Sequence, residues 1–237
     1  MTSTLRAVLA AATRDVGFIA LLGAAVAVSV FPLAAASDNT DAPTPTANHI
    51  VGMYGDPVAA RPYWRQQRTS DCGELAVADV VGEITGNEPT EVDVTNLAVS
   101  TPSAAGPGTI WGRDGNTNIR NLPVLLAHYG IHADNVETTT GALEQALAAG
   151  RKAIVLVNAE TIWNRPGQRK SANHFVVVTG IDARSGVVHL NDSGIVNGSD
   201  EQIPIAAFEQ AWATYHNSAV VTDSMRSSGQ PKPLGKW

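Results

Sequence analysis

The apolar positions between residues 72 and 85 recur with the period of an α-helix. Asp71 and Glu74 precede them with the three-residue spacing of a capping box, and Gly86 supplies a stop signal. The pattern therefore predicts an amphipathic helix that begins at Cys72 and buries one face. That face consists of four aliphatic residues at positions i, i+3, i+4 and i+7, namely Val77, Val80, Val81 and Ile84.

Further periodic segments follow, and their order indicates the fold class. Helical spacing predicts three more helices, at 119–128, 140–149 and 203–214. Short runs rich in β-branched residues predict four strands, at 153–158, 174–180, 187–192 and 219–222. Because helices come first and strands later, we expect an α+β fold with a C-terminal antiparallel sheet rather than a doubly wound parallel sheet.

The N-terminal segment has the pattern of an export signal. Arg6 and Arg14 precede the apolar run at 16–31, and Ala34–Ala36 then offers a cleavage site. These features are typical of a secretory signal peptide, so we expect cleavage after Ala36. The alternative is an uncleaved anchor, which would associate the protein with the membrane, because the segment is long enough to span a bilayer. In both cases the positive-inside rule places the rest of the chain outside the cytoplasmic membrane.

Composition then defines the domain organisation and narrows the partners. A chain of 237 residues with 44% hydrophobic residues is too apolar to be disordered and suits one ordinary domain with extensions. The net charge of −6, without a run of Lys or Arg, argues against a nucleic-acid partner. We expect a signal peptide or anchor at 1–36, a polar linker at 37–50, the folded domain at 51–222 and a flexible tail at 223–237.

The single cysteine needs an explanation in an exported protein. Cys72 has no second cysteine in the chain with which to form an internal disulfide. It is therefore a partner in an intermolecular bridge, a buried inert residue or a reactive nucleophile. At the first position of a helix, unsatisfied backbone N–H groups and the helix dipole favour a thiolate, as nucleophilic catalysis requires.

A predicted hairpin brings a histidine and an aspartate together. If its turn is centred on Ala183, His174 faces Asp192 across the two strands, and directly opposed side chains have Cβ atoms about 4.5–5.5 Å apart. A carboxylate at that distance can orient a histidine that acts as a base. The prediction depends on the register, because a slip of one residue would move Asp192 to the other face and make Asn191 the candidate.

A side-chain amide shortly before the cysteine completes a family resemblance. Gln66 could join the Cys72 backbone N–H in stabilising an oxyanion. The arrangement Gln66-x₅-Cys72-Gly73, with the cysteine opening a helix, is similar to the papain-like superfamily and resembles cysteine-peptidase family thirty-nine in particular. That family includes the double-glycine peptidases that process bacteriocin leaders.

The resemblance extends over most of residues 61–221. The segment Asn173–Asp182 is similar to the His-x-Val-Val-Val-x-Gly strand of the family, and Val188–Asp192 to the strand that ends in its third catalytic residue. Two positions depart from the family pattern: Ser193 stands where proline is usual, and Glu74 replaces a small apolar residue. We expect these departures to affect which substrate is bound more than which residues are catalytic.

The resemblance implies a papain-like cysteine peptidase acting on a peptide or protein substrate without a cofactor, and the N-terminal segment implies that it is exported. In it Cys72 is the nucleophile, His174 the base, Asp192 the orienting group and Gln66 an oxyanion donor. Alternatives are a cell-wall peptide amidase or acyltransferase of the same superfamily, or a non-catalytic peptide-binding module. The remaining histidines lack the paired spacing of a metal site, so we expect no metal. Substrate-binding positions are expected beside the nucleophile and in two long loops, at Gly73, Trp111 and Trp163.

Overall fold

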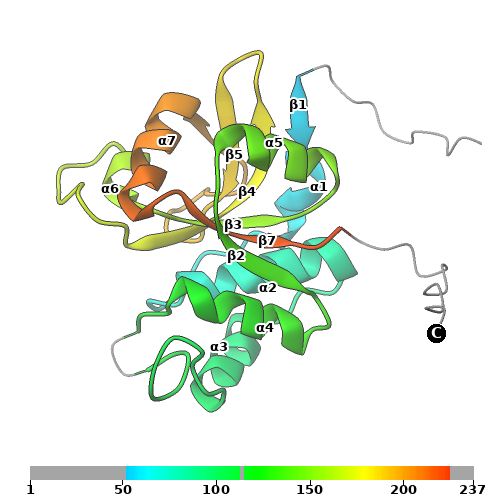
Figure 1. Ribbon diagram of the computed structural model, residues 1–237, viewed down its shortest axis with the longest axis vertical. Coiled ribbons are helices and arrows are strands. Elements are labelled where there is room, and N and C mark those ends of the chain that lie inside the picture. The colour runs from blue at the N-terminus through cyan, green and yellow to red at the C-terminus, as the bar shows by residue number, and fades with distance from the viewer. Residues whose placement is uncertain (1–51, 113–114, 225–237) are drawn as a thin grey trace, which may run out of the picture. The chain divides into compact units, whose positions relative to one another are not determined.

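The computed structural model describes residues 52–112 and 115–224 (Figure 1). The predicted signal peptide or anchor at 1–36, the predicted linker at 37–50 and nearly all of the predicted tail lie outside these residues. Within the two described ranges, no helix is both long and apolar enough to cross a membrane.

The described chain forms an antiparallel sheet with helices on both faces (Figure 1). The strands are ordered β2-β7-β3-β4-β5-β6, and β1 pairs with β4. Their bounds are Met53–Gly55 for β1, Ala133–Glu137 for β2, Ala153–Val157 for β3, His174–Asp182 for β4, Val187–Asn191 for β5, Glu201–Pro204 for β6 and Ser218–Thr222 for β7. The predicted α+β class with an antiparallel sheet is confirmed.

Alternating strand residues divide the core into two layers. Phe175 and Val177 of β4 pack against the N-terminal helices α2, α3 and α4, whereas Val176 and Val178 face the opposite layer with α5, α6 and α7. Figure 1 shows the first group of helices below the sheet and the second group above it. The helices span Cys72–Thr85 (α2), Glu91–Ser100 (α3), Leu122–His128 (α4), Thr140–Ala148 (α5), Ala159–Ile162 (α6) and Ile205–Trp212 (α7).

The helix α2 has the bounds predicted from its apolar spacing, and Gly86 ends it with a left-handed φ of 72°. The predicted capping box is wrong. Asp71 makes no side-chain cap bond, and its Oδ2 accepts a hydrogen bond from Thr95 Oγ1 at 3.2 Å instead. Glu74 is buried and accepts from Thr117 Oγ1. The first turn of α2 is enclosed by neighbouring segments, so both carboxyl groups take tertiary partners.

Several elements differ from the sequence prediction. The predicted helix at 203–214 begins only at Ile205, because Pro204 closes strand β6 and occupies the helix N-cap. Strands β1, β2 and β6 and helices α1, α3 and α6 are absent from the sequence prediction. Strand β2 is mostly solvent-exposed and lacks apolar alternation, while α3 buries only Val94 and Ala98, which is too sparse a pattern to identify a helix. The other short elements are α1 (Pro57–Ala60) and three 3₁₀ helices, η1 (Arg61–Tyr63), η2 (Ile119–Asn121) and η3 (Ala213–Tyr215).

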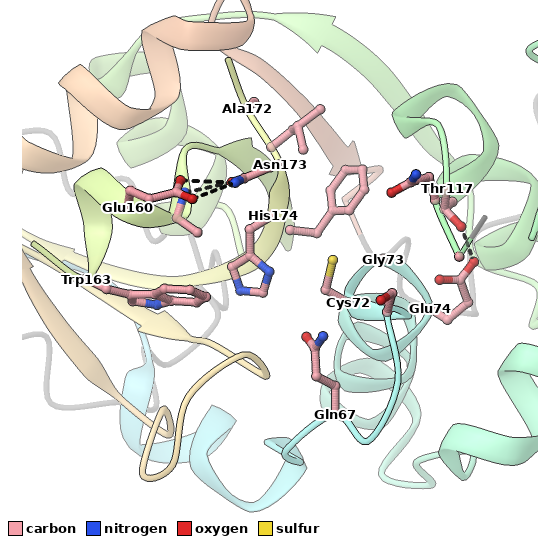
Figure 2. A pocket seen from close by; sticks show the side chains of 16 residues that line it. Gln67, Cys72, Gly73, Glu74, Thr117, Glu160, Trp163, Ala172, Asn173 and His174 are labelled. Carbon is pink, nitrogen blue, oxygen red and sulfur yellow. Dashed lines mark hydrogen bonds between the residues drawn. The ribbon is translucent and has the colours of Figure 1, made fainter. Parts of the chain in front are cut away.

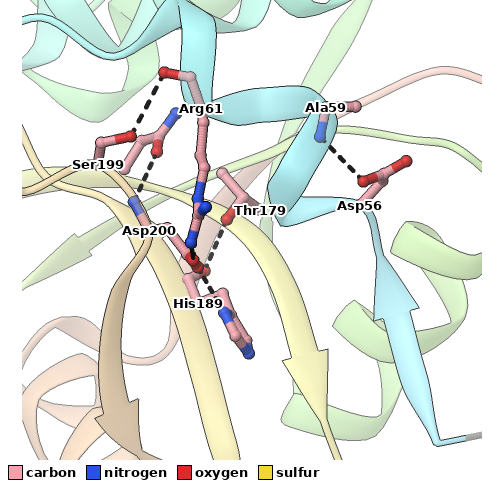
Figure 3. A network of polar contacts seen from close by, with 8 residues as sticks. Asp56, Ala59, Arg61, Thr179, His189, Ser199 and Asp200 are labelled. Carbon is pink, nitrogen blue, oxygen red and sulfur yellow. Dashed lines mark hydrogen bonds and ion pairs between the residues drawn. The ribbon is translucent and has the colours of Figure 1, made fainter. Parts of the chain in front are cut away.

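A polar network fastens the connection between β5 and β6, which runs over residues 192–200 (Figure 3). His189 Nδ1 and Asp200 Oδ1 are 2.5 Å apart, and the Arg61 guanidinium forms an ion pair with the same carboxylate. Burial acts to raise the pKa of Asp200, but the bonds to His189 and Arg61 outweigh it and lower that pKa. The network therefore ties η1 to the end of the connection that begins with Asp192.

Candidate active site

A cavity of about 360 Å³ opens where the start of α2 meets the start of β4 (Figure 2). Cys72, the first residue of α2, and His174, the first residue of β4, both line it. Trp163 contributes a third wall from the end of α6. In residues 52–112 and 115–224, no group of three or more His, Cys, Asp or Glu side chains is arranged to hold a metal ion.

Cys72 is half-buried, and its position follows from the close packing of the helix start. A Cβ atom on Gly73 would lie 3.2 Å from Phe175 Cδ2 and 3.3 Å from Leu122 Cδ2. A larger residue at that position would push α2 away from β4. As the first helical residue, Cys72 also has a backbone N–H without an intrahelical acceptor.

His174 and Asp192 form a buried pair. Nε2 of His174 lies 2.7 Å from Oδ1 of Asp192, and the two side chains are 5% and 0% exposed. This bond leaves Nδ1 as the ring nitrogen that faces the Cys72 thiol (Figure 2). Burial by itself lowers the pKa of His174, but its interactions with Asp192 and Cys72 outweigh burial and raise that pKa to about 10. The imidazole is therefore protonated at neutral pH.

Three further contacts hold Asp192 and His174 in place. Trp163 Nε1 donates to Asp192 Oδ2 at 2.8 Å, and the backbone N–H of Gly194 donates to Oδ1 at 2.7 Å. Although burial acts to raise the pKa of Asp192, the bonds to His174 and Trp163 lower it. The Trp163 ring also packs on His174 with centroids 5.3 Å apart. A Cβ on Gly194 would lie 2.9 Å from His174 Cε1, so only glycine permits this approach.

The predicted register of the β4–β5 hairpin is wrong. The prediction pairs Val178 with Val188, whereas in the structure Val178 pairs with Leu190. The turn lies further along the chain than predicted because Asp182 Oδ1 accepts from the backbone N–H of Arg184 at 2.9 Å, and Gly186 adopts a left-handed φ of 71°.

Asp192 nevertheless reaches His174, because a second irregularity restores the shared face. Near the turn the observed pairing is displaced by three residues from the predicted register. A bulge between Val178 and Gly180 reduces this displacement to two residues. An even displacement keeps His174 and Asp192 on the same face as diagonal neighbours. Asn191 faces the other side, where its Nδ2 donates to Asp79 Oδ2 at 2.8 Å.

The structure does not bring Gln66 to this cavity. Gln66 lines a separate surface pocket, and the neighbouring Gln67 lines the cavity with its amide directed toward Cys72 (Figure 2). The Gln67 backbone N–H donates to the Ser193 carbonyl at 2.9 Å, and its Oε1 accepts from Ser193 Oγ at 2.9 Å. These bonds turn Gln67 inward. The sequence offers two adjacent glutamines and does not show which of them faces the nucleophile.

The two predicted tryptophans have different positions. Trp163 lines the cavity as expected, whereas Trp111 packs on the core between the sheet and the N-terminal helices, with its Nε1 3.4 Å from the Ser70 carbonyl oxygen. Sequence reasoning did not identify Gly194 or Glu160 near the site. It singled out Glu74 only as a departure from the family pattern, and Glu74 lines the cavity.

Comparison with known proteins is consistent with this geometry. The family model described as "Peptidase_C39 like family" matches residues 58–220. The uncharacterized protein Rv1268c of Mycobacterium tuberculosis is 41% identical over 226 residues, which covers 85% of this chain and 97% of the relative. The uncharacterized protein Mb1299c of Mycobacterium bovis matches with the same identity and coverage.

One solved structure gives a likeness at the level of the fold. A crystal structure of a protein assigned as a C39-like peptidase from Bacillus anthracis aligns with a TM-score of 0.54 and 17% identity, covering 72% of this chain and 97% of that one. A double glycine motif protease from an AMS/PCAT transporter, in complex with the leader peptide, has a TM-score of 0.45 and 17% identity, covering 67% and 87%. The shared fold is that of a C39-like peptidase, which is papain-like. The chain belongs to the Peptidase_C39 like family.

Proposed function

We propose that this protein is a cysteine peptidase that cleaves amide bonds with Cys72, His174 and Asp192. The observation that carries the proposal is the pair of His174 and Asp192, with Nε2 and Oδ1 2.7 Å apart, in which His174 lines the same cavity as the half-buried Cys72. A nucleophile, a base and a group that orients the base are the three parts that thiol catalysis requires.

The proposed reaction has two stages. The Cys72 thiolate attacks the carbonyl carbon of the substrate, and protonated His174 delivers its Nδ1 proton to the leaving nitrogen as the C–N bond breaks. The product of this stage is a thioester on Cys72. Neutral His174 then removes a proton from water as the water oxygen attacks the thioester. The C–S bond breaks and the acid product leaves. His174 keeps the proton taken from water, so that a Cys72 thiolate and a protonated His174 are restored.

Asp192 keeps the imidazole in the required orientation during both stages. Its hydrogen bond to Nε2 directs Nδ1 to the sulfur and stabilises the imidazolium form. The bonds from Trp163 and Gly194 fix the carboxylate in turn. Asp192 therefore orients His174. The imidazole of His174 exchanges protons with the substrate, and the Asp192 carboxylate does not.

The oxyanion would be stabilised by the Cys72 backbone N–H and by the Gln67 side chain. Gln67 Nε2 donates one hydrogen to the Thr69 carbonyl at 2.8 Å, and an amide nitrogen carries a second hydrogen. Donors aimed at the developing charge in a partly enclosed site give large rate effects. This assignment replaces the expected role of Gln66.

We also propose that the enzyme acts outside the cytoplasmic membrane on peptide substrates. The apolar run that follows Arg6 and Arg14 supports export, and family membership supports a peptide substrate. N-terminal sequencing of the protein from the extracellular or envelope fraction should begin at Ser37. An intact N-terminus in the membrane fraction would contradict cleavage.

The activity can be tested with a library of amide substrates that includes peptidoglycan fragments. The parent protein should cleave at least one class, and Cys72→Ala should cleave none, because no other group can form the thioester. Products from cell-wall fragments alone would identify a cell-wall amidase. Equal product formation by the parent and by Cys72→Ala would refute the cysteine mechanism. Peptide binding without any turnover by the parent would identify a binding module.

A further inference from the structure

A buried carboxyl group lies two residues after the nucleophile. Glu74 is 1% exposed and lines the same cavity as Cys72. Its Oε1 accepts a hydrogen bond from Thr117 Oγ1, while Oε2 is buried and has no hydrogen-bond partner among the described residues. Figure 2 shows this second oxygen turned away from Thr117, toward the Cys72 side of the cavity. An unpaired carboxylate oxygen in such a place can accept a donor from a bound molecule.

The cavity contains a second carboxylate and little positive charge. Glu160 lies on the far side of His174 from Glu74 (Figure 2), and it accepts hydrogen bonds from neutral amides, including Asn173 Nδ2 at 3.0 Å. Among the described residues that line the cavity there is no Lys or Arg, and neither glutamate forms an ion pair. Among these lining residues His174 is the one group that can carry a positive charge, and its ring is bonded to Asp192. The Arg165 guanidinium lies outside the lining, 4.9 Å from the centroid of the Trp163 ring. Among the described residues, Glu74 and Glu160 thus have no ion-pair partner.

The ionisation state of the Glu74 carboxyl group changes between about pH 5 and pH 7. Burial raises its pKa to about 6, although the bond from Thr117 opposes the increase, and nearby Asp71 adds to it by repulsion. Glu74 is therefore ionised in most molecules at pH 7 and neutral at pH 5. An ionised carboxylate in a poorly solvated position gains most from a positively charged donor.

We propose that Glu74 determines specificity by binding an ammonium group that the substrate carries next to the scissile bond. The inference rests on the proposed peptidase function and names its substrate class. An ammonium group is compact and has three donors, so it can reach a recessed oxygen that a planar guanidinium fits less easily. Asn116 and Thr117 also line the cavity, and their side-chain oxygens are of a type that can accept further donors. A lysine-type side chain and a free α-amino group both supply this chemistry.

The first test compares matched peptides. One pair carries lysine or norleucine beside the cleaved bond, and a second pair has a free or an acetylated α-amino group at that position. The parent should prefer the ammonium member of one pair, and Glu74→Gln should reduce this ratio of kcat/KM by about tenfold or more, as expected for the loss of a bond to a charged group. The preferred pair identifies the source of the ammonium group. Glu144→Gln, on the outer helix α5, is the matched control and should retain the preference of the parent.

The second test measures binding without turnover. In a Cys72→Ala background the affinity for the ammonium peptide should increase between pH 5 and pH 7, and the increase should disappear when Glu74→Gln is added. Glu160→Gln in the same background measures how much the Glu160 carboxylate contributes to the affinity for the ammonium peptide. Because Cys72 contributes to the raised pKa of His174, the reference for each pH profile is the Cys72→Ala protein itself, with and without Glu74→Gln.

The outcomes separate this proposal from the proposed function. An unchanged preference and an unchanged pH dependence in Glu74→Gln would overturn the role of Glu74 even if Cys72→Ala abolishes turnover. Conversely, ammonium-selective binding that depends on Glu74 would support the subsite even if the parent cleaves nothing. If Glu74→Gln fails to fold, the pH dependence of binding in Cys72→Ala alone decides, and a flat profile from pH 5 to pH 7 refutes the proposal.

Discussion

The hydrogen bond from the Trp163 indole to Asp192 can be removed by one substitution, and its loss tests whether the indole holds Asp192 in place. Trp163 Nε1 donates to Oδ2 of Asp192 at 2.8 Å, and the Asp192 side chain is fully buried. Trp163→Phe removes this donor while keeping an aromatic ring beside His174. The carboxylate oxygen would then lose a hydrogen bond in a place where water has little access, and the pKa of Asp192 should move upward.

The size of the effect follows from the charge of the acceptor. A hydrogen bond to a charged group contributes about 1.5–3 kcal/mol to stability. For a domain of this size, 1 kcal/mol corresponds to roughly 2–4 °C in Tm, so Trp163→Phe should lower Tm by about 3–12 °C. Turnover should also decrease, because a less firmly held Asp192 orients His174 less well.

Trp111→Phe is the matched control. Trp111 is half-buried, and its Nε1 lies 3.4 Å from a neutral carbonyl oxygen, so this bond is weaker than the one made by Trp163. Thermal unfolding of the parent and both variants at pH 7, together with kcat on one amide substrate, provides the comparison. Equal losses of Tm for the two variants, or full turnover by Trp163→Phe, would refute the argument that Asp192 depends on the indole.

Three further predictions concern the same residues. Gln67→Ala should lower kcat by about 10²–10³-fold if the amide stabilises the oxyanion, while Gln66→Ala should leave kcat near that of the parent; the reverse result would restore the original assignment. Cys72→Ala and His174→Ala should each abolish turnover, and the double variant should be no worse than either, since the two residues act as a unit; additive losses would indicate separate roles. Because interactions with Asp192 and Cys72 raise the pKa of His174 to about 10, the stability gained from these interactions is fully present below about pH 6.5 and is lost as pH rises through about 10. Denaturant unfolding of the parent and His174→Gln should therefore converge at alkaline pH, and a constant difference would contradict this linkage.

The sequence alone predicts the local elements that carry the site, because their signals are local. The apolar spacing after Cys72 defines α2 and thereby places the cysteine at a helix start. The runs of β-branched residues around His174 and before Asp192 identify two neighbouring strands. Family membership follows from the same motifs, and the matched family model confirms it. The catalytic roles of these residues stay a prediction.

Other features depend on contacts between distant segments. The hairpin register is set by the Asp182 turn and by the bulge before Gly180, and a periodic pattern is compatible with several even displacements. The choice of Gln67 over Gln66 is made by Ser193, more than a hundred residues later in the chain. The environment of Glu74 is likewise determined by Thr117 and by burial beneath the cavity wall. Local spacing determines which residues share an element, whereas tertiary packing determines which way each polar side chain faces and how strongly its charge is stabilised.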